Sequence, residues 1–146
     1  MLRVLKAFFP ALLLTYVVAA VLATSSVMSS LRGMGVEVSA ATQMQATWHD
    51  LLGMAPSYLL LILAAFVIAL PVAALLSRRL GGWRLPLFAL AGAVAMLALH
   101  QLMHALLLIT PVAVARTPLG LLGQCLAGAL GGLMYALLSR RTPRST

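Results

Sequence analysis

The residues best suited to chemistry in this sequence are polar side chains set inside long apolar runs. His100 and His104 are four residues apart, which places both imidazoles on one face of a helix. Imidazoles at this spacing can bind a metal ion together, or one can be an axial haem ligand. Counting 1.5 Å per residue from the outward helix ends puts Tyr16, Tyr58, His100, His104 and Gln124 at similar depths of about 7–14 Å. These five residues form the predicted cofactor-binding set.

A metal site is predicted from His49, His100 and His104, because His49 opens an apolar run at the same outward level. Several methionines also lie on this side of the predicted spans, and thioethers suit Cu(I). Haem, quinone and copper are therefore all candidate cofactors. The alternative is structural, since histidine and glutamine in helix bundles often form hydrogen bonds between helices.

The motifs of common enzyme classes are missing. The sequence holds only two acidic residues, Glu37 and Asp50, and neither lies within an apolar run, which disfavours a transporter built on membrane carboxylates. It contains no P-loop, HExxH or CxxC motif and no Ser/His/Asp arrangement. The lone Cys125 excludes an intrachain disulfide. A non-catalytic role is the favoured hypothesis.

Composition assigns the chain to a class. Of its 146 residues, 63% are hydrophobic and 8% are charged, against about 25% charged residues in a soluble domain. This number of charged residues is too small to cover a water-exposed surface. We therefore expect lipid to surround most side chains. The net charge of +8 is gathered in short clusters at the ends of apolar runs, which argues against nucleic acid as a partner.

Four apolar segments are long enough to cross a bilayer, which requires roughly 20 residues. They run over about 5–24, 51–76, 85–109 and 118–138, and together they predict one all-α transmembrane domain over residues 1–146, a four-helix bundle. The first segment also resembles a secretory signal peptide with a cleavage site at Ala23, although its length favours an uncleaved helix. The connection over about 25–47 is predicted to be an outward-facing loop, and loops of this length are commonly functional.

The basic residues predict the orientation, since Lys and Arg concentrate on the cytoplasmic side. Arg32 and Arg116 are the only basic residues on the outward side of the four predicted spans. The other eight share the opposite side, so both termini are expected in the cytoplasm of a bacterial inner membrane: Arg3, Lys6, Arg78, Arg79, Arg84, Arg140, Arg141 and Arg144.

Local signals mark two helix starts. The sequence Thr47-Trp48-His49-Asp50 fits a capping box that opens the second span. Thr117-Pro118 fits an N-cap followed by proline at the first helical position, which opens the fourth span.

Small residues crowd the fourth span. Gly120, Gln124, Ala127 and Gly131 form one stripe, and Gly128 begins a small-xxx-small motif beside it. Such surfaces let helix backbones approach closely, either within one chain or between two proteins. The leading hypothesis is an accessory or assembly subunit of a larger membrane complex, or a small homo-oligomer, whose partner or second copy binds this glycine-rich helix. The alternative is a ligand- or cofactor-binding membrane protein that uses the polar layer.

Overall fold

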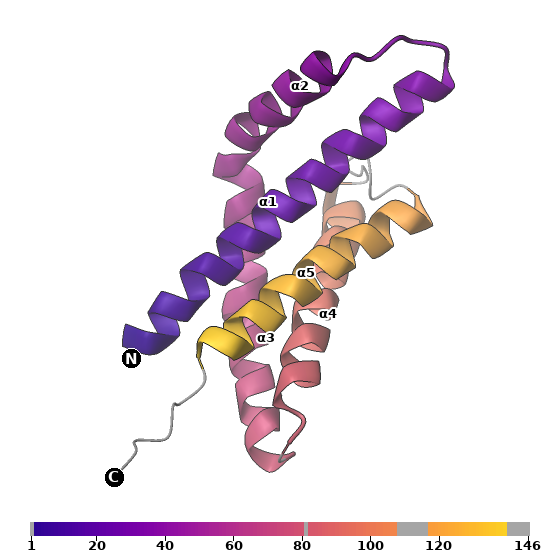
Figure 1. Cartoon of the computed structure of the whole chain (residues 1–146). Helices are drawn as coiled ribbons and strands as arrows, with labels where there is room; N and C mark the ends of the chain where they lie inside the picture. Colours follow the sequence, from indigo (N-terminus) through magenta and orange to yellow (C-terminus); the bar gives the residue numbers. More distant parts are fainter. Residues whose placement is uncertain (1, 81, 108–116, 140–146) are drawn as a thin grey trace.

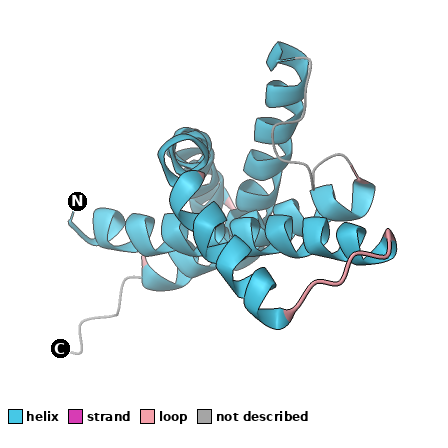
Figure 2. Ribbon diagram, turned by 90° about the horizontal axis from the view of Figure 1, so that it is seen from above, coloured by secondary structure: helices cyan, strands magenta, loops and turns pink. Residues whose placement is uncertain are grey.

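The computed structural model describes residues 2–80, 82–107 and 117–139, and every regular element in these ranges is a helix (Figures 1 and 2). Four of the helical stretches are long and apolar enough to cross a membrane, which confirms the all-α prediction with four candidate spans. The elements in order are α1 (Leu2–Gly33), α2 (Ala40–Gly53), the π-helix η1 (Ala55–Leu59), α3 (Leu60–Arg79), α4 (Arg84–Leu107) and α5 (Pro118–Leu138).

The candidate spans cross one another rather than running parallel. In Figure 1, α1 slants across the molecule with α5 beside it in the opposite direction, while α3 and α4 form a steeper antiparallel pair. Seen from above, α3 is viewed almost end-on and α1 runs across the picture (Figure 2). The start of α1, the end of α5 and the turn between α3 and α4 lie toward one end of the molecule, and α2 lies at the other.

Helix α1 is longer than the segment predicted over 5–24. It continues through the serines of the expected loop, where the Ser30 hydroxyl donates to the Ser26 carbonyl one turn earlier at 3.0 Å. Such bonds let serine remain inside a helix. At 1.5 Å per residue its 32 residues reach about 48 Å, more than the roughly 30 Å of a hydrocarbon core. Gly35, at φ +82°, then turns the chain back in a conformation that suits glycine.

Most of the remaining outward connection is a second helix, α2, where a loop was predicted. Ser39 is its N-cap, and the Ser39 hydroxyl accepts a hydrogen bond from the Thr42 amide at 3.1 Å. The predicted capping box at Thr47–Asp50 is therefore wrong. Thr47 lies within α2 and donates to the Gln43 carbonyl at 2.8 Å, and the second candidate span begins at Ala55.

The bundle interior is built from small residues on α1 and α5. Every fourth residue of α1 is small and buried along the face that meets α5: Ala7, Ala11, Thr15, Ala19 and Ala23. A Cβ added at Gly131 of α5 would stand 3.0 Å from the Ala11 carbonyl oxygen, so the two backbones are in direct contact there. Close approach of this kind raises van der Waals contact where lipid removes the hydrophobic incentive.

Glycines also join α5 to α4. Gly92 of α4 faces Gly128 and Gly132 of α5, and a Cβ on any of the three would overlap the opposing backbone. The glycine-rich helix therefore packs within the chain, on α1 through Gly131 and on α4 through Gly128 and Gly132. Thr117 caps α5 as predicted, since its hydroxyl accepts from the Gly120 amide at 3.1 Å.

Candidate functional site

Polar contacts join all four candidate spans at one buried level. The Tyr58 hydroxyl of η1 donates to Gln124 Oε1 of α5 at 2.8 Å, and Gln124 Nε2 donates to the Ala19 carbonyl of α1 at 3.0 Å. On α4, His100 Nε2 lies 3.3 Å from the same Tyr58 hydroxyl. We call Tyr58, His100 and Gln124 the polar layer. Their exposed fractions are 3%, 6% and 0%.

Donor and acceptor chemistry fixes the roles within this layer. Carbonyl oxygens can only accept, so the Gln124 amide must turn its NH₂ group to Ala19 and its oxygen to Tyr58. The His100 Nδ1 lies 2.8 Å from the Met96 carbonyl and therefore carries a proton. A neutral His100 ring then has no proton on Nε2, so the Tyr58–His100 contact is a hydrogen bond only when the single Tyr58 proton turns from Gln124 to Nε2, and at 3.3 Å it is the longest contact of the set.

Local backbone geometry places Tyr58 in the layer. It lies in a π-helical turn, Ala55–Leu59, that is separated from α2 by Met54 alone and contains Pro56 near its start. Turns of this kind shift the direction of the following side chains relative to a regular α-helix. The Tyr16 ring lies against the Tyr58 ring with centroids 6.2 Å apart, and the Tyr16 hydroxyl donates to the Leu51 carbonyl of α2 at 2.6 Å.

A second polar contact ties α1 to α2 above the layer. The Thr24 hydroxyl lies 2.8 Å from Asp50 Oδ2 and 3.1 Å from the Ala20 carbonyl of its own helix. Thr24 is buried, and Asp50 is half-buried beside it. The Asp50 carboxylate, which the sequence assigns to a helix cap, is instead an anchor between two helices. Nothing in the sequence near Thr24 distinguishes it from the serines that follow.

The five residues predicted for cofactor binding separate into two groups. Tyr16, Tyr58, His100 and Gln124 are buried together, whereas His104 is exposed near the C-terminal end of α4. Among the buried four, the hydrogen-bonding atoms are directed to one another or to backbone carbonyls. This arrangement can hold helices in register, and cofactor binding there stays a prediction.

The three histidines predicted as a metal site are not gathered in one place. His49 is exposed on α2 and His104 on α4, while His100 is buried. Within the described ranges, no group of three or more His, Cys, Asp or Glu side chains lies close enough to hold a metal ion.

An apolar groove between α3 and α4 is the second candidate site, and the sequence analysis did not identify it. Its volume is about 820 Å³, and its lining runs from Leu61 to Leu76 on α3 and from Leu87 to Leu106 on α4. Alanines occur along both walls between larger aliphatic side chains: Ala65, Ala69 and Ala73 on α3, and Ala91, Ala95 and Ala98 on α4. In the sequence, the four-residue spacing of Ala65, Ala69 and Ala73 is the pattern that could have indicated this groove.

Comparison with family models, curated proteins and solved structures finds no match for this chain. Fold and site together define its class as an all-helical protein with four candidate membrane spans, as expected of a multi-pass membrane protein.

Proposed function

We propose that this chain is a non-catalytic, multi-pass protein of a bacterial inner membrane that acts as an accessory or assembly subunit. Its partner is another membrane protein, and a transmembrane helix of that partner packs into the groove between α3 and α4. The groove is the observation that carries the proposal. The glycine-rich face of α5, which the sequence offered for this purpose, already packs on α1 and α4.

The groove suits a helix because both of its walls carry alanine. Without a hydrophobic force between helices in lipid, association depends on close van der Waals contact, which small residues permit. Helix α3 has much of its surface free for such contact, since only Ile62, Phe66, Leu70 and Ala73 of its residues are buried within the chain. A partner helix would cover this free surface.

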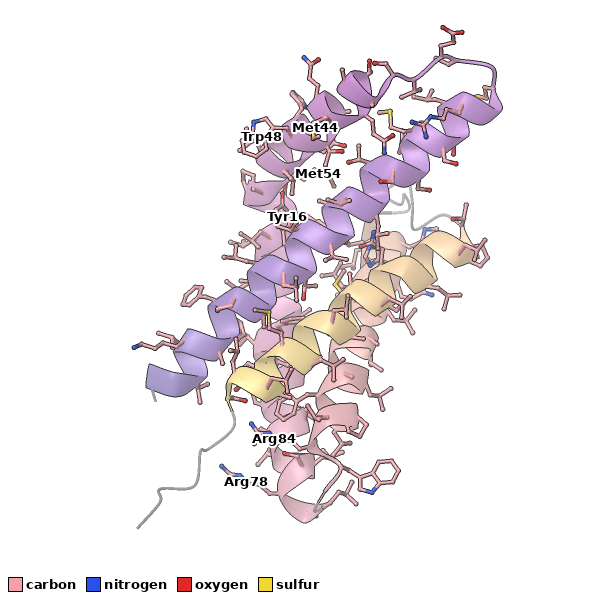
Figure 3. All side chains as sticks on the ribbon, in the orientation of Figure 1. Tyr16, Met44, Trp48, Met54, Arg78 and Arg84 are labelled. Carbon is pink, nitrogen blue, oxygen red and sulfur yellow. The ribbon has the colours of Figure 1, made fainter. Side chains whose placement is uncertain are left out.

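The charge distribution supports insertion with both ends of the chain in the cytoplasm. Arg78 and Arg84 lie at one end of the molecule, near the turn between α3 and α4, while α2 with Met44 and Trp48 lies at the other (Figure 3). The basic end is the cytoplasmic end by the positive-inside rule.

Two groove-filling variants test the partner. Ala64 and Ala98 are exposed and line the groove, so phenylalanine at either position fills it without disturbing the chain's own core. Ala64→Phe and Ala98→Phe should keep the thermal unfolding midpoint in mild detergent but lose the co-purifying membrane protein. Ala129→Phe on α5, outside the groove, should keep both.

The mass of the detergent-solubilised particle separates the outcomes. A wild-type particle built only of identical copies, which Ala98→Phe dissociates, would identify the occupant as a second copy of this chain. A particle whose mass and composition are the same in all variants would refute the groove as an interface.

Reporter fusions test insertion and orientation. Glu37 is exposed in the connection between α1 and α2, so an insertion there leaves both helices intact. Alkaline phosphatase inserted after Glu37 should be active and a fluorescent protein in its place dark, with the reverse result for fusions after Arg141. The opposite pattern at both sites would invert the topology.

Ligand binding by the polar layer is the alternative function. It is favoured only by the presence of His100 at the membrane-embedded end of the hydrogen-bond chain. A visible absorption spectrum and metal analysis of the purified protein test it. A haem band or stoichiometric copper that disappears in His100→Leu, with folding retained, would replace the structural reading by a cofactor site.

A further inference from the structure

Helix α2 presents a strip of large apolar side chains that no other described element covers. Met44, Trp48 and Leu52 recur every four residues and are exposed by 75%, 65% and 61%. At 100° per residue they fall within an arc of about 80° on the helix surface. We call these three residues the apolar strip. Figure 3 shows Met44 and Trp48 on α2, at the end of the molecule opposite Arg78 and Arg84.

The rest of the α2 surface divides into two further sectors. On one side of the strip, at about 60–120° from Trp48, lie the exposed polar residues Thr42, Gln45 and His49. On the opposite side, Gln43 and Asp50 are half-buried and bind α1, with Gln43 Oε1 accepting from Arg32 at 2.7 Å and Asp50 contacting Thr24. The helix thus has an apolar sector, a polar exposed sector and a sector bound to α1.

We propose that α2 lies in the membrane–water interface, with the apolar strip immersed among phospholipids of the outer leaflet. Three different neighbours are needed to satisfy three sectors: α1 for the bound sector, water for the polar sector and lipid for the strip. An amphipathic helix with a tryptophan on its apolar face is the usual form of such an interfacial element. The indole places its ring in the acyl boundary and keeps its N–H hydrated.

The position of α2 in the chain supports lipid as the occupant. It follows candidate span α1 after only residues 34–39 and passes into candidate span Ala55–Arg79 after Met54. Its C-terminal end is therefore held where the next candidate span enters the membrane, and its N-terminal end is tied to α1 by the short connection. Its contacts with α1, through Asp50 and through the Leu51 carbonyl that accepts from Tyr16, prevent it from moving away into water. The inference rests on the proposed membrane insertion.

Tryptophan fluorescence tests the inference because the chain has only two tryptophans. Trp83→Phe leaves Trp48 as the reporter. Trp48→Phe leaves Trp83, which is exposed in the turn between α3 and α4 at the other end of the molecule. Each variant is reconstituted in phosphatidylcholine vesicles whose lipids are brominated near the carbonyl end or near the methyl end of the acyl chain. Iodide added to the solution reports contact with water.

We expect Trp48 to lose most of its emission to bromine near the carbonyl end, less to bromine near the methyl end, and little to iodide. This order corresponds to a depth of about 5–10 Å within the headgroup and acyl boundary. Met44→Asp, introduced in the Trp83→Phe background, should lift the strip from lipid and make Trp48 sensitive to iodide. The matched control Gln45→Asp lies on the polar sector and should leave the quenching order unchanged.

Other outcomes overturn the inference in recognisable ways. Trp48 quenched by iodide alone would mean that the strip faces water, and Trp48 quenched by neither agent would mean that a protein partner covers it. If Trp83 responds to brominated lipid in those cases, insertion stands and only the inference on α2 fails. If neither tryptophan responds to brominated lipid, the proposed insertion fails as well.

Discussion

Replacing Gly128 by alanine should force α4 away from α5. An added Cβ would lie 2.8 Å from the Gly92 carbonyl carbon and 2.5 Å from Met96 Cγ, and would overlap the Gly92 carbonyl oxygen. The Met96 side chain can rotate, but the Gly92 backbone can move only with α4. Carbon atoms in ordinary contact are about 3.5–4.0 Å apart, so α4 must withdraw by roughly 1 Å at this crossing.

The size of the effect follows from that displacement. A radial gap of about 0.5–1 Å forfeits roughly a quarter to a half of the dispersion energy between the atoms concerned. Overpacking of this kind costs typically about 1–3 kcal/mol. Gly123→Ala on the same helix is the matched control, because its Cβ would meet only Leu22 Cδ1, at an ordinary 3.5 Å. Both variants gain the same helix propensity, so their difference isolates the packing cost.

The assay is unfolding by sodium dodecyl sulfate in mixed micelles, followed by circular dichroism. We expect the free energy of unfolding of Gly128→Ala to fall about 1–3 kcal/mol below that of Gly123→Ala. Gly92→Ala should cost a similar amount, and the double variant with Gly128→Ala should cost less than the sum, because one withdrawal relieves both overlaps. Equal free energies of unfolding for Gly128→Ala and Gly123→Ala would refute the reasoning. So would a double variant of Gly92→Ala and Gly128→Ala whose cost is the full sum of the two single costs.

The polar layer leads to two further predictions in the same assay. A double-mutant cycle with Tyr58→Phe and Gln124→Leu should give a coupling free energy of about 0.6 kcal/mol and at most about 1.7 kcal/mol. This is the range for hydrogen bonds between membrane helices. A coupling free energy of zero would show that the 2.8 Å hydrogen bond between the two side chains does not stabilise the bundle. His104→Leu should change the free energy of unfolding by less than about 0.5 kcal/mol because the side chain is exposed, whereas His100→Leu should cost about 1–3 kcal/mol by removing a buried partner of Tyr58 and Met96. Equal effects of the two histidine variants would contradict this distinction.

The sequence predicted the parts of the fold that depend on long stretches of composition. An apolar run such as 118–138 carries its signal in every residue, and Thr117 with Pro118 marks its start, so α5 has the predicted bounds. The end of α1 was missed because serines and glycines read as loop residues, while in the structure Ser30 satisfies its hydroxyl within the helix. The N-cap of the helix before the second span was misassigned because Thr47 and Ser39 are both followed by residues that can form a helix. Only the three-dimensional structure shows that the helix begins after Ser39.

The candidate site was predicted in part for a related reason. Depth can be counted along each helix, and this count placed Tyr58, His100 and Gln124 at one level, where the structure joins them. How far the neighbouring helices cover each level of a helix cannot be counted in the same way, because it depends on how the helices cross. His104 shares its helix face with His100 at the sequence level, yet it lies one turn further out, where the bundle no longer encloses it.

Two kinds of contact hold this bundle together: close backbone packing at small residues, and side-chain contacts. Helices α1, α4 and α5 meet through small residues, so their backbones contact directly and dispersion holds them. Helix α3 contains no glycine, and its largest buried side chain, Phe66, meets α5 beside Gly131, 3.2 Å from the position of an added Cβ. The η1 turn that precedes α3 adds the Tyr58–Gln124 hydrogen bond to α5. Because the groove opens along the same helix, a partner helix seated there would contact the candidate span that is least buried within the chain, and would cover the free surface of α3.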